Sequence, residues 1–557
     1  MKRISNVLLF LENRTEALDN NIALGMKTNL GWNELTFRGL STLSRRLANY
    51  LIKNKVDKGD KLAIISESMP EWGAALFASV LSGAITIPLD IKLTYFEMNS
   101  ILNNCKPKIL IVSNAFLETG LKLKDEIDSI EQIIILDDSG SNTAYPSLYN
   151  IPDEPDRKWR HRALSKTAFI IYTSGTTGVP KGVEITFKNA MAQVESVGQC
   201  FDLGVNDKFL SILPMNHLFE LTVGFLSFLS KGTSIYYSQS LKPKDVFSIM
   251  QDKQITFMIV VPAFLKLLKS GIEGEISQLS KIKKFFFNLN YKIAGLIPFY
   301  SIRKLLFLSI HKNFGGKFKG CISGGAPMDI NVGKFFETLG LRIYEGYGLS
   351  EASPVVAVNR GNKCKLGSIG PAIPGVEVKI DAKTGELLVK GDNVMKGYYN
   401  RPDLTSEVIE PDGWLHTGDV AQIDKEGFIY ITGRIKNMIV LSGGKKVFPE
   451  DLETVYEKSP KFAEVCVFGA KRSGGAKDGT EDVFVSVVPS QMMLEKYENN
   501  NEELEKELKE EIKTLSMKLS SYKRPKNIII TKNPFPRTST RKIKRNEVKK
   551  LLLETVS

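Results

Sequence analysis

Cysteine pairs, long apolar runs and an export signal are the features that this sequence lacks. Its 557 residues contain five cysteines and no CxxC pair, which argues against a zinc site and against a disulfide framework. No stretch approaches the roughly 20 consecutive apolar residues of a membrane-spanning helix. The N-terminal MKRISNVLLFLENR has a short apolar run, but Glu12 and Arg14 interrupt it and no small-residue cleavage site follows. We therefore expect a cytoplasmic protein, either soluble or peripheral to the inner face of the membrane.

Acidic residues are missing from one long segment. Between Ile276 and Met328 there is no Asp or Glu, while nine Lys and Arg side chains supply nine of the thirteen net positive charges. Aromatic residues are interleaved with these charges, a pattern typical of helices lying in an anionic lipid interface. The same pattern also fits amphipathic helices that pack inward. Nucleic-acid binding ranks last because no nucleic-acid motif accompanies the charge, so we expect no such partner. Residues 276–320 remain a candidate membrane surface.

Length and periodicity indicate an α/β fold with more than one domain. A chain of 557 residues exceeds what one hydrophobic core usually supports. Short apolar runs at 61–65, 84–88 and 108–112 alternate with helical patterns such as 71–82, as in a parallel sheet covered by helices. We expect a large N-terminal domain of stacked mixed or parallel sheets, residues 1–435, and a small mobile α+β C-terminal domain, residues 436–557.

The segment YTSGTTGVPKGV at 172–183 combines hydroxyl side chains, glycines and one lysine directly after an apolar run. It is not the P-loop pattern, because Lys181 follows Pro180 and precedes Gly182. The physical chemistry is similar nevertheless. Glycines let backbone N–H groups approach an anion, hydroxyls donate to phosphate oxygens, and Lys181 supplies charge. The segment therefore predicts a phosphate site, with a flexible surface turn as the alternative.

Seven further segments accompany this loop in chain order. They are PMNHLFE at 214–220, SGGAPM at 323–328, YEGYGLSE at 344–351, GELLVKGDNVMKGYYNRPD at 385–403, WLHTGDVA at 414–421, GRIKNMIVLSGGKKVFPEDLE at 433–453 and PRTSTRKIKR at 536–545. With YTSGTTGVPKGV, this series resembles the AMP-forming acyl-CoA synthetases of the adenylate-forming superfamily, and most of all the bacterial long-chain fatty-acid ligases.

The resemblance implies a two-step reaction with ATP, Mg²⁺ and coenzyme A. A carboxylic acid reacts with ATP to give acyl-AMP and pyrophosphate, and the acyl group then passes to the thiol of coenzyme A. Thr173 and Glu351 match the positions that bind Mg²⁺ in the family. The resemblance assigns the phosphates to Lys181 and to Thr173, Ser174, Gly175, Thr176, Thr177 and Gly178.

For the nucleoside, the resemblance points to two glycine-containing segments and one acidic residue. Tyr347 matches the aromatic that stacks on adenine, and Asp419 matches the ribose ligand, assisted by Arg434. The other adenine and ribose positions are Gly324, Gly325, Ala326, Pro327, Glu345, Gly346, Gly348 and Ser350.

The acyl and thiol ends of the reaction are assigned by the same resemblance. His217 matches a residue at the mouth of the acyl pocket, where it contacts the substrate carboxylate. Lys436 matches the hinge of the small domain, and Lys542 matches the catalytic lysine of the first step. The loop with Ser442, Gly443 and Gly444 approaches the thiol. Two residues depart from the family pattern: Asn437 stands in place of an acid, and Arg541 stands in place of the glycine before Lys542.

The apolar region 260–318 favours a long-chain fatty acid, since burial contributes about 0.8 kcal/mol per CH₂. One alternative is an enzyme that loads a carrier-protein phosphopantetheine instead of coenzyme A. A second, from another class, is a non-catalytic membrane scaffold that binds nucleotide.

Overall fold

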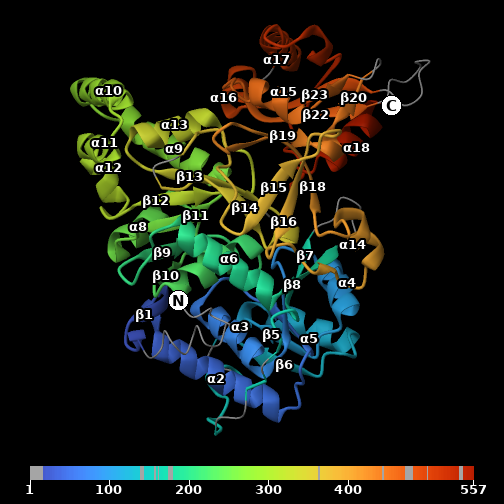
Figure 1. The fold of residues 1–557 in the computed structure, drawn as a ribbon. Coiled ribbons are helices and arrows are strands. Elements are labelled where there is room, and N and C mark those ends of the chain that lie inside the picture. Colours follow the sequence, from blue (N-terminus) through green and yellow to red (C-terminus); the bar gives the residue numbers. More distant parts are fainter. Residues whose placement is uncertain are drawn as a thin grey trace. The chain divides into compact units, whose positions relative to one another are not determined.

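The computed structural model describes residues 17–137, 144–155, 159–160, 162–173, 180–361, 364–441, 445–470, 481–498, 500–537 and 543–556. The chain divides into two compact units (Figure 1). The first unit comprises Met1–Val378 and Val389–Leu415, and the second comprises Lys379–Leu388 and His416–Ser557. The sequence predicts a domain border after residue 435, where a mobile C-terminal domain would begin, and this border stays a prediction.

A seven-stranded sheet of the first unit has the order β17-β8-β7-β4-β3-β5-β6. Its strands are parallel except at β8, which runs antiparallel to both neighbours. The runs expected to be strands at 61–65, 84–88 and 108–112 are three of its members, which confirms them. The strand bounds are β3 Lys61–Ile65, β4 Ile85–Pro88, β5 Ile109–Val112, β6 Gln132–Ile135, β7 Thr167–Thr173, β8 Lys181–Thr186 and β17 Gly397–Tyr398.

An eight-stranded sheet of the same unit has the order β14-β13-β12-β11-β9-β10-β1-β2. Its interior pairs are parallel, and the edge pairs β13–β14 and β1–β2 are antiparallel. The stacked mixed sheets expected from the sequence are therefore confirmed. The bounds are β1 Ile22–Thr28, β2 Gly31–Thr36, β9 Lys208–Ser211, β10 Ser234–Tyr237, β11 Phe257–Val260, β12 Gly320–Ser323, β13 Ile343–Gly348 and β14 Val355–Val358.

Helices follow most of these strands, as expected for crossover connections. Between β2 and β6 along the chain the helices are α2 Phe37–Lys53, α3 Pro70–Ser82, α4 Tyr95–Cys105, η1 Asn114–Phe116 and α5 Leu117–Glu126. Between β8 and β13 they are α6 Phe187–Cys200, η2 Phe219–Ser227, α7 Phe228–Ser230, α8 Pro243–Lys253, α9 Pro262–Ser277, α10 Lys281–Leu296, α11 Tyr300–Leu306, α12 Leu308–Asn313 and α13 Ile330–Thr338. The short elements η3 Ser350–Ala352 and α14 Pro402–Val408 complete the unit.

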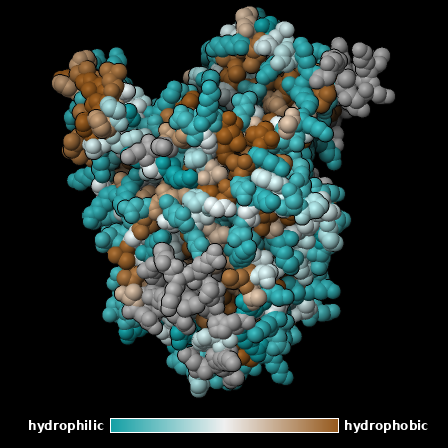
Figure 2. Space-filling view, in the orientation of Figure 1, coloured by the Kyte–Doolittle hydropathy of each residue, from teal (hydrophilic) through white to brown (hydrophobic). Residues whose placement is uncertain are grey.

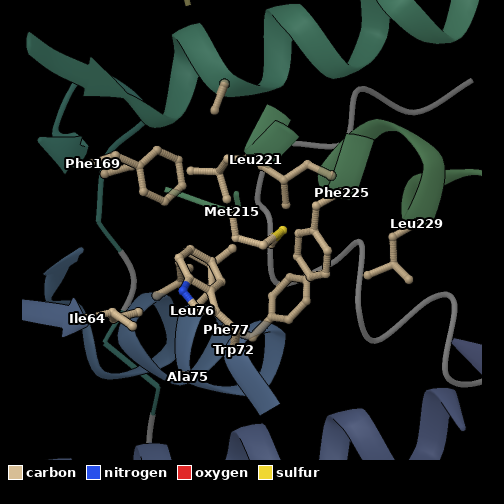
Figure 3. Close-up of a cluster of buried hydrophobic side chains, with 14 of the residues drawn as sticks. Ile64, Trp72, Ala75, Leu76, Phe77, Phe169, Met215, Leu221, Phe225 and Leu229 are labelled. Carbon is tan, nitrogen blue, oxygen red and sulfur yellow. The ribbon is translucent and has the colours of Figure 1, made fainter. Parts of the chain in front are cut away.

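Helix α3 lies in the centre of the largest hydrophobic core. Pro70 suits the first helical position because its φ is fixed, and Gly83 ends the helix in a left-handed conformation at φ 79°. All 13 residues of α3 are buried. Figure 3 shows Phe77 of α3 against Phe225 of η2, and their ring centroids are 5.7 Å apart. A helix that is apolar on every face is stable only with neighbours all round.

The second unit contains a three-stranded sheet with the order β22-β23-β24, covered by helices. Tyr456 and Leu508 are fully buried in its core. The bounds are β22 Phe462–Ala470, β23 Asp482–Pro489, β24 Asn527–Ile530, α15 Pro449–Tyr456, α16 Gln491–Lys496, α17 Asn501–Ser516 and α18 Arg545–Val556. Smaller elements are η4 Ile435–Asn437, β20 Ile439–Val440, β21 Lys446–Val447 and η5 Ser521–Lys523.

A further sheet has the order β15-β16-β18-β19, with bounds β15 Val376–Ile380, β16 Glu386–Gly391, β18 Leu415–Ile423 and β19 Ile429–Arg434. The α/β class, with a smaller α+β unit, is confirmed. Among the described residues, none of the helices has the length and apolar content needed to cross a membrane.

Candidate active site

The predicted phosphate loop begins at the end of β7 and ends at the start of β8. These strands form an antiparallel hairpin in which Thr173 pairs directly with Lys181. The hairpin therefore fixes the two ends of the loop beside each other, with a hydroxyl and a cation at its base. The predicted residues Ser174, Gly175, Thr176, Thr177 and Gly178 lie outside the described residues.

Tyr398 connects the base of this loop to Glu351. The Lys181 Nζ lies 5.3 Å from the centre of the Tyr398 ring, and the Tyr398 hydroxyl donates to Glu351 Oε1 at 2.7 Å. Burial, with the Glu351 charge as a second cause, holds the pKa of Tyr398 well above its usual value, so the phenol remains a donor. The structure thus links Thr173, Lys181 and Glu351, whereas the sequence interpretation had not singled out Tyr398. Its position in the motif segment KGYYNRPD was the available signal.

Both predicted adenine segments lie at the carboxyl ends of neighbouring strands. β12 and β13 are parallel, with Ser323 opposite Glu345, so Gly324 and Gly346 follow at one edge of the sheet. That edge is where open α/β sheets bind ligands. Gly325 has a φ of 84°, which favours glycine. A Cβ atom at Gly348 would lie 2.0 Å from the Pro354 carbonyl oxygen, so only glycine fits there as well.

Glu345 is directed into the protein and stabilises the loop beyond β14. The backbone N–H of Gly367 donates to its Oε2 at 2.9 Å. Burial raises the pKa of Glu345 to about 7, and the Gly367 hydrogen bond opposes that shift. Ser350 and Glu351 belong to the turn η3, directly after the strand β13 that contains Tyr347. Ala326 and Pro327 are exposed beyond the buried Gly324.

A small apolar cavity begins at these glycines. It has a volume of about 80 Å³, below the ~300 Å³ typical of pockets for drug-sized ligands. Phe201 forms part of its wall and packs edge-on against Tyr344, with ring centroids 5.2 Å apart. The lining consists of Val197, Phe201, Phe219, Val223, Ile322, Gly324, Gly325, Gly346, Tyr347, Gly348, Pro354, Val355 and Val358. The glycine segments predicted to bind adenine therefore also line the apolar cavity.

His217 lies two residues before η2, the element that contributes Phe219 and Val223 to the cavity wall. The Leu221 backbone N–H donates to the His217 carbonyl at 2.9 Å, which anchors the residue to η2. Its Nε2 lies 3.9 Å from Oδ2 of Asp90, a mostly buried residue after β4. The side chain of His217 is 26% exposed, but its Nε2 atom is buried.

Glu220, the last residue of the PMNHLFE motif, is fully buried in η2. Burial raises the pKa of Glu220 to about 8, against a smaller opposing effect of the Ser211 hydroxyl. The side chain folds back over Gly224, where an added Cβ would meet its Oε1 at 2.7 Å. Glu220 is therefore a mostly protonated group next to the cavity at neutral pH, and the sequence interpretation had assigned it no role.

In the second unit, Asp419 of β18 and Arg434 of β19 are direct cross-strand partners. The Arg434 Nε donates to Asp419 Oδ1 at 2.5 Å. Asp419 is 3% exposed, and the arginine side chain is half-exposed. The structure thus brings this predicted pair together. His416, three residues before Asp419, contacts Glu386 Oε2 through Nδ1 at 2.9 Å.

The predicted hinge and thiol-side residues follow Arg434. Lys436 is exposed in the turn η4, and its neighbour Asn437 donates to Glu450 Oε1 at 2.7 Å. An acid at position 437 would meet the Glu450 carboxylate, which gives a physical reason for the amide. Ser442, Gly443 and Gly444 lie outside the described residues.

Lys542 and Arg541 also lie outside the described residues, which end at Arg537 and resume at Ile543. Arg537 and Ile543 form an antiparallel bridge. The guanidinium of Arg545 donates to Glu453 Oε2 at 2.6 Å, and Lys544 pairs with Glu547 at 2.9 Å. Arg545 is therefore part of the folded unit and does not belong to a solvated basic tail.

Parallel strands that end in glycine segments, a hydroxyl-rich hairpin loop and an adjoining apolar cavity define an α/β protein with a nucleotide-type site. Two family models match the chain: AMP-binding enzyme over residues 11–399, and AMP-binding enzyme C-terminal domain over residues 451–542. Because the first covers most of the sequence, the chain belongs to the AMP-binding enzyme family.

Curated relatives and solved structures agree with this assignment. The chain is 29% identical over 459 residues to the long-chain-fatty-acid–CoA ligase FadD15 of Mycobacterium bovis, covering 79% of this chain and 76% of that protein. It is 28% identical to a long-chain-fatty-acid–CoA ligase of Escherichia coli, covering 92% and 90%. The fold matches ATP-bound MatB of Rhodopseudomonas palustris with a TM-score of 0.79 at 22% identity, covering 99% and 100% of the two chains.

Proposed function

We propose that the protein is an AMP-forming fatty acid–CoA ligase. It activates a fatty acid, preferably one with a long chain, with ATP and then transfers the acyl group to coenzyme A. The observation that carries the proposal is the shared boundary between the glycine strip and the apolar cavity, because acyl adenylation needs the nucleotide and an apolar acid in contact. The names of the long-chain ligases among the relatives support the same activity.

In the first step, a carboxylate oxygen of the acid attacks the α-phosphorus of ATP, and the bond to the bridging oxygen breaks to release pyrophosphate. Lys181 and the loop after Thr173 bind the phosphates. They stabilise the negative charge that develops on the departing pyrophosphate. His217 contacts the acid carboxylate at the mouth of the cavity. Asp419 and Arg434 bind the ribose, and Tyr347 stacks on adenine.

Thr173 and Glu351 are the residues that hold Mg²⁺ in this proposal. Carboxylate and hydroxyl oxygens are ligands that Mg²⁺ prefers. The Tyr398 hydroxyl donates to Oε1 of Glu351, and Oε2 has no partner among the described residues. The Thr173 hydroxyl and the Glu351 carboxylate therefore suit Mg²⁺ as ligands. When bound, Mg²⁺ supplies charge neutralisation at the phosphates. Tyr398 orients the carboxylate.

In the second step, the thiol of coenzyme A attacks the acyl carbonyl carbon and AMP leaves with the bonding electron pair. We propose that residues 436–557 turn about Lys436 between the steps, so that Lys542 acts in the first step only. Ser442, Gly443 and Gly444 then approach the thiol. Long-chain acids partition into lipid, so we place the enzyme in the cytoplasm, peripheral to the inner face of the membrane.

Product analysis tests this proposal and its alternatives. Purified protein is incubated with palmitate, ATP and Mg²⁺, and either coenzyme A or a holo-carrier protein is added as the thiol acceptor. We expect palmitoyl-CoA and AMP in equal amounts. If the carrier protein were the only acceptor that became acylated, the protein would be assigned as a carrier-protein-loading enzyme instead of a coenzyme A ligase. Absence of AMP with acids of any chain length would instead favour a non-catalytic scaffold.

A further inference from the structure

Helix α10 exposes most of its apolar side chains. Only Ala294 among its 16 residues is buried. Figure 2 shows hydrophobic atoms gathered at the protruding lobe where Figure 1 places α10. The six outward apolar side chains range from 42% to 87% exposed and are Ile282, Phe285, Phe286, Leu289, Ile293 and Leu296.

The exposed surface continues along the next two helices. Phe299 precedes α11, Ile302 and Leu305 belong to it, and Leu308 begins α12. Of 25 exposed large apolar residues among those described, ten lie between Ile282 and Leu308. We call these ten side chains the α10–α12 surface. Scattered exposed apolar residues need no explanation, but a cluster of this size marks an interaction site.

The outward residues do not form the face with which α10 packs on the protein. Phe287 and Tyr291 point inward: their ring centroids lie 5.5 Å from Phe307 and 6.1 Å from Phe335, respectively. Successive helical residues are offset by about 100°, which places Phe285, Leu289 and Leu296 almost opposite Phe287 and leaves Phe286 on the flank, about 100° from it. Helix α10 is therefore apolar on two faces, and core packing accounts for only one of them.

Positive charge accompanies the outward face. By the same 100° offset, Lys281 and Lys292 border it, whereas Lys283 and Lys284 lie nearer the Phe287 side of the first turn. Lys281, Lys283, Lys284 and Lys292 are all exposed. No carboxylate among the described residues lies within ion-pairing distance of these four ammonium groups. Because residues 276–328 contain no Asp or Glu, the charge is not neutralised locally in the sequence either. A partner for this surface must offer apolar contact and negative charge together.

We propose that the α10–α12 surface docks on an anionic lipid bilayer, with its Phe, Leu and Ile side chains below the headgroups and its lysines at the phosphates. A second copy of the chain fits less well, because a two-fold interface would bring like-charged lysines of the two copies together. Nucleic acid would match the charge but would leave the aliphatic side chains without a partner.

Docking through this surface has a consequence that rests on the proposed function. A long-chain acid resides mainly in the bilayer, so an enzyme held at the headgroup layer meets a higher concentration of its substrate than one in bulk water. Docking itself does not depend on catalysis, and binding to vesicles measures it separately.

Flotation of the full-length protein with vesicles tests the proposal. The vesicles consist of phosphatidylcholine alone or of phosphatidylcholine mixed with phosphatidylglycerol. We expect binding to the mixed vesicles and little binding to the neutral ones, with a decrease at high salt. Replacement of Lys281, Lys283 and Lys284 by Glu should lower the partition coefficient by at least about 100-fold, since each basic residue contributes about fivefold near an anionic surface.

A second variant tests the apolar part of the surface. Phe285→Ser, Phe286→Ser and Leu289→Ser are combined, and we expect vesicle binding to fall while activity on a water-soluble medium-chain acid stays at the wild-type value. The matched apolar control replaces three exposed side chains elsewhere in the unit, Leu30, Phe96 and Leu241, by Ser. The matched charge control replaces the exposed lysines Lys58, Lys242 and Lys244 by Glu.

The outcomes distinguish the possible partners of the α10–α12 surface. Binding lost in both α10 variants and retained in both controls supports lipid docking. Equal binding of all variants, equal binding to neutral and anionic vesicles, or no binding of the wild type contradicts it. A wild-type dimer that becomes monomeric in the Phe285, Phe286 and Leu289 variant, with vesicle binding unchanged, would assign the surface to a second copy. Loss of vesicle binding with normal acyl-CoA synthesis leaves the proposed function intact.

Discussion

Helices α3 and α10 are both rich in apolar residues, yet their environments are opposite. All 13 residues of α3 are buried among side chains from its own sheet and from η2, whereas α10 buries one residue of 16. The comparison teaches that apolar content alone does not determine burial. What decides it is whether the fold supplies neighbours on every side. Helix α3 belongs to the core that supports the site, and α10 forms an outward surface.

The largest expected contrast concerns stability. Trp72 of α3 is 1% exposed in the core cluster of Figure 3, and Phe286 of α10 is 56% exposed. We expect Trp72→Ala to lower the free energy of unfolding by about 3–5 kcal/mol. Phe286→Ala should change it by less than about 0.5 kcal/mol. Urea denaturation of the two variants measures both values, and equal losses would remove the contrast between the helices.

A contrast in pH dependence follows from Glu220 in η2, which packs against α3. Its pKa is raised to about 8 in the folded protein from 4.5 in the unfolded chain, so the stability from this group is complete below pH 4.5 and falls as the pH rises toward 8. The slope is about 1.4 kcal/mol per pH unit, on the order of 3 kcal/mol between pH 5 and pH 8. Glu220→Gln should remove this slope in denaturation curves at the two pH values.

The matched comparison for Glu220 is an exposed acid. Asp252 of α8 is 42% exposed and pairs with Lys27 at the surface, so Asp252→Asn should change the free energy of unfolding by less than about 1 kcal/mol. If Glu220→Gln and the wild type lost stability in parallel between pH 5 and pH 8, Glu220 would already be ionised in the folded protein. That result would contradict the burial argument for η2.

The third contrast concerns the first half-reaction. Glu351→Gln keeps an oxygen that can accept from the Tyr398 hydroxyl, so the fold should be unchanged, but an amide oxygen is a poorer Mg²⁺ ligand. We expect acyl-adenylate formation to fall about 100-fold, in the range found when one stabilising group is lost from an active site. Phe286→Ala should retain the wild-type rate with a water-soluble acid. If Glu351→Gln reached the wild-type rate at saturating Mg²⁺, Glu351 would not be a ligand of the metal.

The smallest contrast concerns chain length. Phe201 closes part of a cavity of about 80 Å³, so Phe201→Ala should favour longer acids. Each additional buried methylene contributes about 0.8 kcal/mol, close to fourfold in the ratio of kcat/KM values. Competition between a medium-chain and a long-chain acid measures this ratio independently of any loss in stability. An unchanged ratio would mean that the alkyl chain does not extend past Phe201.

Much of the fold could be predicted from local patterns. The runs at 61–65 and 108–112 form strands because they are apolar and bounded by polar residues, and Pro449 begins a helix because its fixed φ suits the first helical position. The order of strands in the two sheets could not be predicted in the same way, because it depends on long-range packing. Strands β7 and β4, for instance, are adjacent although three helices and two strands separate them in sequence.

The candidate site shows a similar limit. The resemblance to the acyl-CoA synthetases pointed to Thr173, Lys181 and Glu351, and the structure links them through Tyr398. The resemblance did not identify Tyr398, whose role depends on a hydrogen bond across 47 positions of sequence. Nor did sequence distinguish the inward Phe287 from the outward Phe286, since neighbouring aromatics in a helix look alike until the packing partners are known. The predicted residues Lys542 and Gly443 lie outside the described chain and stay predictions.

Isotope exchange between ATP and labelled pyrophosphate tests the central claim, adenylation of a fatty acid, most directly. The reaction contains the protein, palmitate, ATP and Mg²⁺, and no coenzyme A. Because acyl-AMP forms reversibly before any thiol is used, we predict that label enters ATP, that exchange requires the acid, and that Glu351→Gln loses it while Phe286→Ala retains it. Exchange that occurs only when coenzyme A is present, or no exchange with any acid, would contradict an acyl-adenylate intermediate.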